Sequence, residues 1–151
     1  MRMQSVQDLS GIMTREDFIK RLCEVFGEEP GAVFSKGRNN GWLEQEDELF
    51  RQDAICRKNV ARILHMYLLK EKGIPDLSDI SKAAVLHDLY DCRVCANHVS
   101  QIYLRGIMDA GDQAVNGGFL WFDLDGTAED TDIGEALRRS LDLVRRMEEK
   151  E

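Results

Sequence analysis

The sequence has no long hydrophobic run, and several residue types are scarce. Prolines number only 2 and aromatic residues make up 7% of the 151 residues. Basic residues are outnumbered by acidic ones, 20 against 28, which gives a formal net charge of −8. No apolar segment approaches the roughly 20 residues that cross a bilayer. These shortages argue against a transmembrane segment, against an all-β sandwich, and against general binding to nucleic-acid phosphates.

The residues that are present suit one folded domain. Hydrophobic residues make up 43% and charged residues 32%, which is enough apolar material for a core. No Pro/Ser-rich linker or low-complexity tract divides the chain. We therefore expect a polar lead-in over residues 1–11, a single domain over residues 12–148 and a frayed C-terminus over residues 149–151.

The N-terminal residues and the cysteines bear on location. Residues 1–8 contain no apolar h-region, so no signal peptide is visible. Cys23, Cys56, Cys92 and Cys95 are interpreted as ordinary thiols of a reducing compartment, with a disulfide framework as the weaker alternative. We expect the chain as it stands to be cytoplasmic, whereas a cell-surface location would need an export signal or a parent protein.

Apolar periodicity predicts a mainly α-helical chain. Thr14, followed by Asp17 as in a capping box, opens the first helix, and Gly27 ends it. The clearest apolar stripe predicts a helix over residues 55–71 and consists of Val60, Ile63, Leu64, Tyr67 and Leu68. Further helices are expected near residues 31–36, 79–90, 92–105 and 131–148. The acidic stretch over residues 44–48 is expected to be a loop, and the apolar run over residues 119–122 to be extended.

Segments of the chain repeat one another. Residues 13–22 align with residues 55–64, because in both an arginine stands at the helix start and apolar residues follow in phase. A weaker third copy covers residues 128–137. A glycine followed by two apolar residues precedes the second and third copies, at Gly41 and Gly106. An internal repeat of this kind predicts a fold built from copies of one structural unit.

At these residues the sequence resembles the S-layer-homology (SLH) family. The family's repeat has a first helix, a glycine turn, a loop of the type F-x-P-D-G-T, and a motif I-T-R-A-E that opens a second helix. Residues 13–17 are similar to that motif, residues 96–108 to the first helix and its turn, residues 122–127 to the loop, and residues 76–80 to the repeat opening. The resemblance covers about residues 12–145. It implies helix-pair repeats in a pseudo-threefold bundle.

The resemblance also implies a non-catalytic domain that anchors to acidic secondary cell-wall polysaccharide. The motif arginine contributes to that binding site, which points to Arg15 and Arg57, with Thr14 at the motif threonine. A guanidinium binds a carboxylate through two parallel hydrogen bonds, and the free N–H groups of a helix start face the same way. Asp130 stands at this position in the third copy, so we expect that copy to be silent.

Two other interpretations of these arginines remain open. In one, both are solvent-exposed helix-start residues that bind nothing. In the other, the bundle is kept but its partner is a protein, which gives an intracellular protein-interaction module.

An enzymatic alternative centres on Asp123. Residues 119–127 match the first motif of haloacid-dehalogenase-type phosphatases, in which the first aspartate is the nucleophile, the second is a general acid, and both help to place Mg²⁺. That motif needs a parallel α/β sheet around it. Only 24 residues follow Thr127, and their pattern predicts one helix. We therefore expect no catalytic residues and keep a phosphatase fragment as an alternative.

Two metal-site patterns are incomplete. Cys92, Cys95 and His98 are possible zinc ligands, but their spacing on one continuous helix does not let them converge, and no second Cys-x-x-Cys exists. A calcium loop counted from Asp123 would need a glutamate at its twelfth position, where Gly134 stands. We expect no metal and no cofactor.

Overall fold

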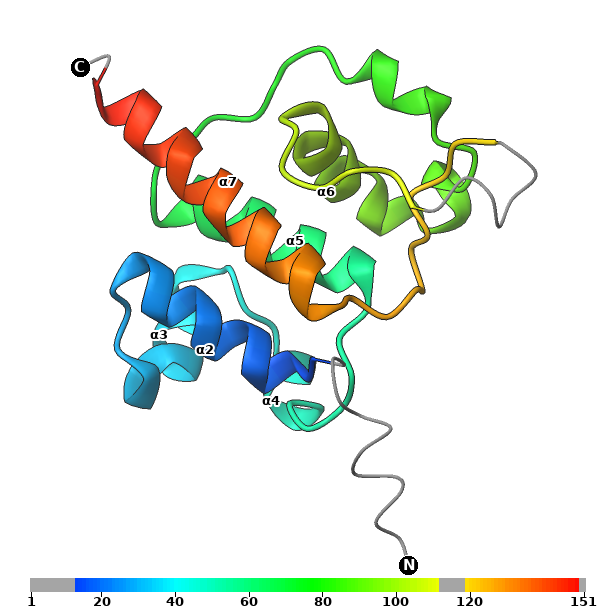
Figure 1. Cartoon of the computed structure of the whole chain (residues 1–151). Helices are drawn as coiled ribbons and strands as arrows, with labels where there is room; N and C mark the ends of the chain where they lie inside the picture. The colour runs from blue at the N-terminus through cyan, green and yellow to red at the C-terminus, as the bar shows by residue number, and fades with distance from the viewer. Residues whose placement is uncertain (1–12, 112–118, 150–151) are drawn as a thin grey trace, which may run out of the picture.

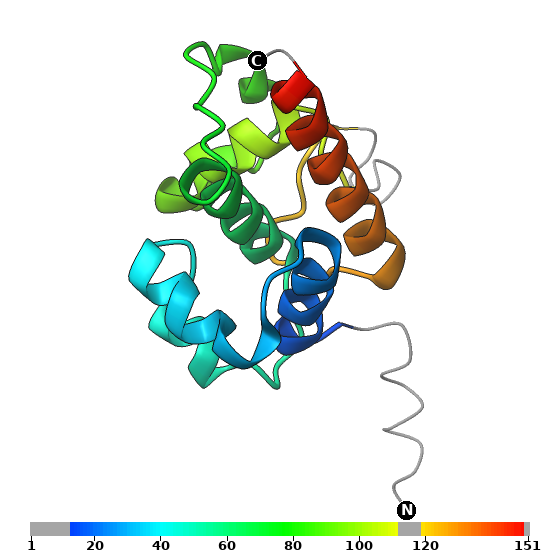
Figure 2. The same ribbon diagram turned by 90° about the vertical axis from the view of Figure 1, so that its left-hand side faces the viewer.

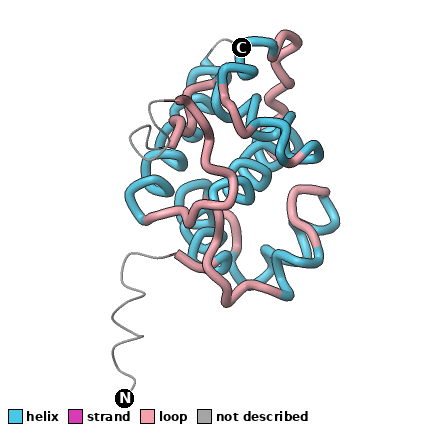
Figure 3. The backbone as a smooth tube through the Cα atoms, turned by 90° about the vertical axis from the view of Figure 1, so that its right-hand side faces the viewer, coloured by secondary structure: helices cyan, strands magenta, loops and turns pink. Residues whose placement is uncertain are grey.

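The computed structural model describes residues 13–111 and 119–149 (Figure 1). The expected lead-in over residues 1–11 lies outside the described residues, as do residues 150–151. The described part of the chain is 63% helical, with six α-helices and no strand (Figure 3). The prediction of a mainly helical chain is confirmed.

Four of the six described helices begin and end within two residues of the predicted positions, one runs beyond the helix expected near residues 31–36, and one was not predicted. Their bounds are α2 Arg15–Phe26, α3 Val33–Asn40, α4 Gln45–Leu49, α5 Arg57–Lys70, α6 Arg93–Leu104 and α7 Asp130–Glu149, with 3₁₀ segments at η1 Pro30–Ala32, η2 Ser81–Val85 and η3 Leu89–Asp91. Glu149, which is expected to belong to the frayed C-terminus, is the last residue of α7.

Helix α5 lies at the centre of the fold. It packs against α6 on one side and α7 on another, and α2 packs against α7 and α4 (Figures 1 and 2). Every residue of its predicted apolar stripe is buried. The stripe therefore forms the centre of the core.

Two segments differ from the sequence prediction. Residues 79–90 form two 3₁₀ segments instead of an α-helix, because their buried apolar residues, Ala83, Leu86 and Leu89, recur every three residues, which is the 3₁₀ period. The acidic stretch forms the short helix α4. Residues 119–122, which are expected to be extended, form no helix, and no strand pairs with them in the part of the chain that the structure describes.

Backbone hydrogen bonds join the three aligned helix starts. The Ile55 N–H donates to the Met13 carbonyl at 2.8 Å, and the Ile55 carbonyl accepts from the Ala128 N–H at 2.9 Å. These three residues are the first residues of the three aligned copies. Isolated bridges accompany the bonds, between Thr14 and Ala54 and between Cys56 and Thr127.

The loop before the second copy caps the helix of the first copy. The loop before the third copy caps the helix of the second copy in the same way. At the start of α2, the N–H groups of Arg15 and Glu16 donate to the carbonyls of Asp53 and Arg51, both at 2.9 Å. At the start of α5, the N–H groups of Arg57 and Lys58 donate to the carbonyls of Gly126 and Leu124, at 2.8 and 3.0 Å. Each loop therefore satisfies helix N–H groups that have no partner within their own helix.

The two glycine turns are also equivalent. Gly41 after α3 and Gly106 after α6 have φ angles of 87° and 74°, in the left-handed region that favours glycine. The next residue, Trp42 or Ile107, donates its N–H to a carbonyl five residues back and is buried. The two positions aligned in the sequence thus have the same local structure.

Within residues 13–111 and 119–149, no helix has the combination of length and apolar character that spanning a bilayer requires.

We predict that Leu64→Ala lowers the free energy of unfolding by roughly 2–5 kcal/mol, because the side chain is fully buried at the centre of α5. Urea denaturation measures the change. Leu49→Ala is the control, since Leu49 is 66% exposed and its loss is expected to change stability by less than about 0.5 kcal/mol. Equal effects of the two substitutions would contradict the assigned core.

Candidate functional site

The two motif arginines line separate grooves. Arg15 lines a groove of about 550 Å³ between the starts of α4, α5 and α6, here called the Arg15 groove. Arg57 lines a smaller one of about 190 Å³ beside the start of α7, here called the Arg57 groove. The structure therefore does not bring Arg15 and Arg57 into one site.

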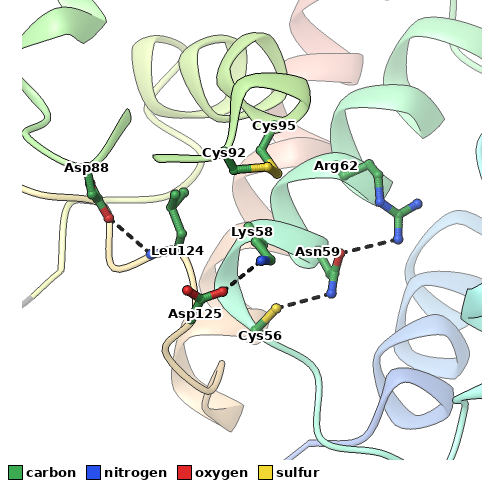
Figure 4. Close-up of a disulfide and its surroundings, with 9 residues drawn as sticks. All are labelled: Cys56, Lys58, Asn59, Arg62, Asp88, Cys92, Cys95, Leu124 and Asp125. Carbon is green, nitrogen blue, oxygen red and sulfur yellow. Dashed lines mark hydrogen bonds and ion pairs between the residues drawn. A yellow bond between two sulfur atoms is a disulfide. The ribbon is translucent and has the colours of Figure 1, made fainter. Parts of the chain in front are cut away.

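The charged residues of the Arg15 groove are of both signs. They are Arg15, Glu44, Glu46, Lys58, Arg62 and Asp125. Lys58 donates to Asp125 at 2.7 Å, and this hydrogen bond raises the pKa of the lysine. Figure 4 shows this pair beside the first turn of α5.

A buried carboxylate, Asp47, holds Arg15 in place. One Asp47 oxygen accepts from Arg15 and Arg62 at 2.6 Å each, and the other accepts from Arg62 at 3.0 Å and from the Glu44 N–H at 2.8 Å. The Asp47 side chain is 0% exposed and each arginine side chain 11%. The interpretation of Arg15 as a solvent-exposed residue is therefore wrong.

Thr14 has a structural role at the same helix start. Its hydroxyl accepts from the Asp17 N–H at 3.0 Å, and the Asp17 carboxylate accepts from the Thr14 N–H at 3.2 Å. This is the capping box predicted from the sequence.

Arg57 is likewise buried, so its interpretation as an exposed residue is also wrong. Its guanidinium donates to the carbonyls of Phe122 and Asp109 at 2.9 and 2.5 Å and to the Asp132 carboxylate at 3.3 Å. It also lies over the Phe122 ring, 4.8 Å from the centroid. These contacts connect the start of α5 to the loop before α7.

Asp130, at the corresponding position of the third copy, forms an exposed ion pair with Arg21 of α2. It therefore helps to join α7 to α2.

The loop that carries the phosphatase-like motif is held by a buried aspartate. The Asp88 carboxylate accepts from the N–H groups of Phe122, Asp123 and Leu124 at 2.7, 2.8 and 3.2 Å. No parallel sheet surrounds Asp123 in the described part of the chain. The motif thus lacks here the strand context that its phosphatase role would need.

Two of the four cysteines are not free thiols. Cys92 and Cys95 form a disulfide, with Cα atoms 5.2 Å apart, whereas Cys23 and Cys56 are free. The expectation of four ordinary thiols is wrong for this pair. Cys92 is the N-cap of α6 rather than part of the helix, and both cysteines line the Arg15 groove (Figure 4).

His98, which also lines the Arg15 groove, begins a chain of hydrogen bonds with a second histidine and an aspartate. The Nδ1 atoms of His65 and His98 lie 2.7 Å apart, and His65 Nε2 lies 2.7 Å from Asp76. Burial, reinforced by His65 and Arg62, lowers the pKa of His98 to about 4, so its ring is neutral near pH 7.

A carboxylate only accepts, so the His65–Asp76 bond places a proton on His65 Nε2. The other ring nitrogen of His65 faces His98, whose ring lines the Arg15 groove.

No group of three or more histidine, cysteine, aspartate or glutamate side chains in the described part of the chain has the arrangement of a metal site.

Sequence reasoning missed Asp47, Arg62 and Asp88. The spacing Glu44-x-x-Asp47 is a capping-box pattern and is the one signal that could have pointed to α4. Asp88 acts on residues more than thirty positions away, and no local pattern marks it.

No protein-family model, curated protein or solved structure matches the chain. The resemblance to SLH repeats therefore stays a prediction from the sequence motifs.

We predict that Asp47→Ala lowers the free energy of unfolding by about 3–5 kcal/mol, because it leaves two buried arginines without their carboxylate. Thermal or urea unfolding measures the loss. Glu48→Gln, in the same helix, is the control, because Glu48 pairs with Arg38 at an exposed position and such pairs contribute about 0–1 kcal/mol. A loss for Asp47→Ala no larger than that of the control would contradict the assigned role.

His98 is expected to make the protein less stable in acid. Unfolded His98 takes up a proton near pH 6.5, whereas in the folded protein the pKa is about 4. The contribution of the neutral ring is complete above pH 6.5 and is lost as the pH falls to 4. A nuclear magnetic resonance titration of the ring, with the urea-unfolded chain as control, checks this. Equal midpoints in the two states would contradict the burial of His98.

Proposed function

We propose that this protein is a non-catalytic binding module whose helix-pair units surround a pseudo-threefold centre, as in SLH domains, and whose Arg15 groove binds acidic polysaccharide. One observation carries the proposal. The motif arginine Arg15 and a second cation, Lys58 of the next copy, line the same groove at the junction of two copies.

Backbone hydrogen bonds between residues at equivalent positions of the aligned copies support the pseudo-threefold arrangement. Ile55 pairs with Met13 on one side and with Ala128 on the other, and the loops over residues 51–53 and 124–126 make matching caps.

Lys58 is the cation of the groove that a carboxylate-bearing ligand would bind in this proposal. Lys58 is paired with Asp125, whose side chain is 84% exposed, and an exposed pair of this kind contributes only about 0–1 kcal/mol. A ligand carboxylate can replace Asp125 at little cost. Because the whole chain carries a net charge of −8, attraction of an acidic polymer depends on this local site.

The other two motif residues have supporting roles in this proposal. Thr14 caps α2 and so positions Arg15. In the Arg57 groove, a ligand carboxylate would take the place of Asp132, the only side-chain carboxylate that Arg57 contacts in the described residues.

We predict that Arg15→Ala and Lys58→Ala each weaken binding of acidic, pyruvylated cell-wall polysaccharide by about tenfold or more, since a charge-assisted hydrogen bond contributes roughly 1.5–3 kcal/mol. Asp125→Asn is expected to strengthen binding, because it removes the competing carboxylate. Isothermal titration calorimetry measures all three, with a neutral polysaccharide as the control ligand.

Asp130→Ala is the matched control variant and is expected to leave the affinity unchanged, because it alters a helix-start position outside the groove. Circular dichroism verifies that each variant is folded. Absence of binding by the unmodified chain would overturn the polysaccharide proposal and favour a protein partner. A weaker affinity in Asp125→Asn would show that Lys58 is not the binding cation.

A further inference from the structure

We propose that Cys92 and Cys95 are a redox-active pair that exchanges with thiols and disulfides entering the Arg15 groove, with His98 as the proton acceptor. Neither cysteine is buried, and their disulfide lines a groove of about 550 Å³. A disulfide that holds a fold together is normally shielded and links distant segments. This one joins residues three positions apart and faces open space, which suits exchange.

Within the pair, Cys92 is the attacking residue. It occupies the N-cap of α6, where its side chain makes no capping hydrogen bond. The unpaired N–H groups of a helix start stabilise a thiolate at that position. Cys95 lies in the first turn of α6, so it is placed to attack Cys92 in the second step.

Proton acceptance falls to His98, one helical turn beyond Cys95 and lining the same groove. Its Nδ1 is engaged by His65, which is in turn held by Asp76. We assign the proton to Nε2, the other ring nitrogen, and the ring is neutral near pH 7.

The two free thiols are poorer candidates for this chemistry. Burial and nearby glutamates raise the pKa of Cys23 to about 11, which keeps it protonated. Cys56 accepts a hydrogen bond from the Asn59 amide at 3.1 Å and has no partner thiol three residues away (Figure 4).

The exchange balances with a small disulfide such as glutathione disulfide as oxidant. The Cys92 thiolate attacks one glutathione sulfur, the glutathione S–S bond breaks, and one glutathione thiolate leaves and takes a proton from water. His98 then removes the proton of Cys95, whose thiolate attacks Cys92 and displaces the second glutathione. His98 returns its proton to that leaving thiolate. Two protein thiols are oxidised and one glutathione disulfide is reduced to two glutathione molecules.

The experiment uses the full chain carrying Cys56→Ser, because serine is a favourable N-cap residue and the substitution removes a competing thiol. Cys95→Ser and Cys92→Ser are added separately, and each reduced variant is mixed with glutathione disulfide. Mass spectrometry follows formation of the mixed disulfide. We expect Cys92, tested in Cys95→Ser, to react at least tenfold faster than Cys95, tested in Cys92→Ser.

The same reactions in guanidinium chloride are the control, where the two rates should converge because the helix start is lost. Equal rates in the folded protein, or a Cys92 rate no higher than in denaturant, would overturn the proposal. Circular dichroism reports whether each variant is folded, and the comparison is repeated with alanine in place of serine if one is not.

His98→Gln tests the proton acceptor in the chain that keeps both cysteines. Formation of the Cys92–glutathione adduct should change by less than twofold, whereas its conversion to the Cys92–Cys95 disulfide should slow at least fivefold. A purely structural role of His98 would affect both steps alike or neither, and either result would remove it from the mechanism.

Discussion

The backbone of Ile55 is the constraint on which the arrangement of the other elements depends. Its N–H and carbonyl bond to Met13 on one side and Ala128 on the other, so the starts of α2, α5 and α7 are held in one place. The side chain is fully buried, so these bonds are protected from water. At the first positions of α2 and α5, Arg15 and Arg57 each line one of the two grooves.

Two buried aspartates, Asp47 and Asp88, add side-chain contacts to these backbone hydrogen bonds. Asp47 joins the start of α2 to the side of α5 through two arginines, and Asp88 holds three consecutive N–H groups of the loop before α7. A buried carboxylate is stable only when its oxygens are satisfied, and both meet that condition. The protein therefore uses ionic and polar contacts as well as apolar packing to fix these segments.

The sequence predicted the elements whose signals are local. The stripe from Val60 to Leu68 and the capping box at Thr14 are patterns within one helix, and both were confirmed. The roles of Arg15 and Arg57 were not predictable in this way, because their acceptors, Asp47 and the Phe122 carbonyl, come from other parts of the chain. The turn over residues 50–53 was not predictable for a related reason. In it, as in the turn over residues 123–126, the first residue's carbonyl accepts from the N–H three residues later. Residues 50–53 lack the Asp-Gly sequence that marks the other turn.

The caps at the helix starts have a consequence for the order in which the chain can fold. The first N–H groups of α5 find their acceptors at Leu124 and Gly126, which leave the ribosome long after the helix itself. Until those residues are synthesised, these N–H groups can bond only to water, and the start of this central helix is not yet capped. Pairings between distant segments are slow to form because the intervening chain must first be ordered. A nascent chain that stops short of residue 119 would therefore expose the side of α5 that packs against α7, and chaperone binding at that stage would depend on residues that are buried in the finished protein.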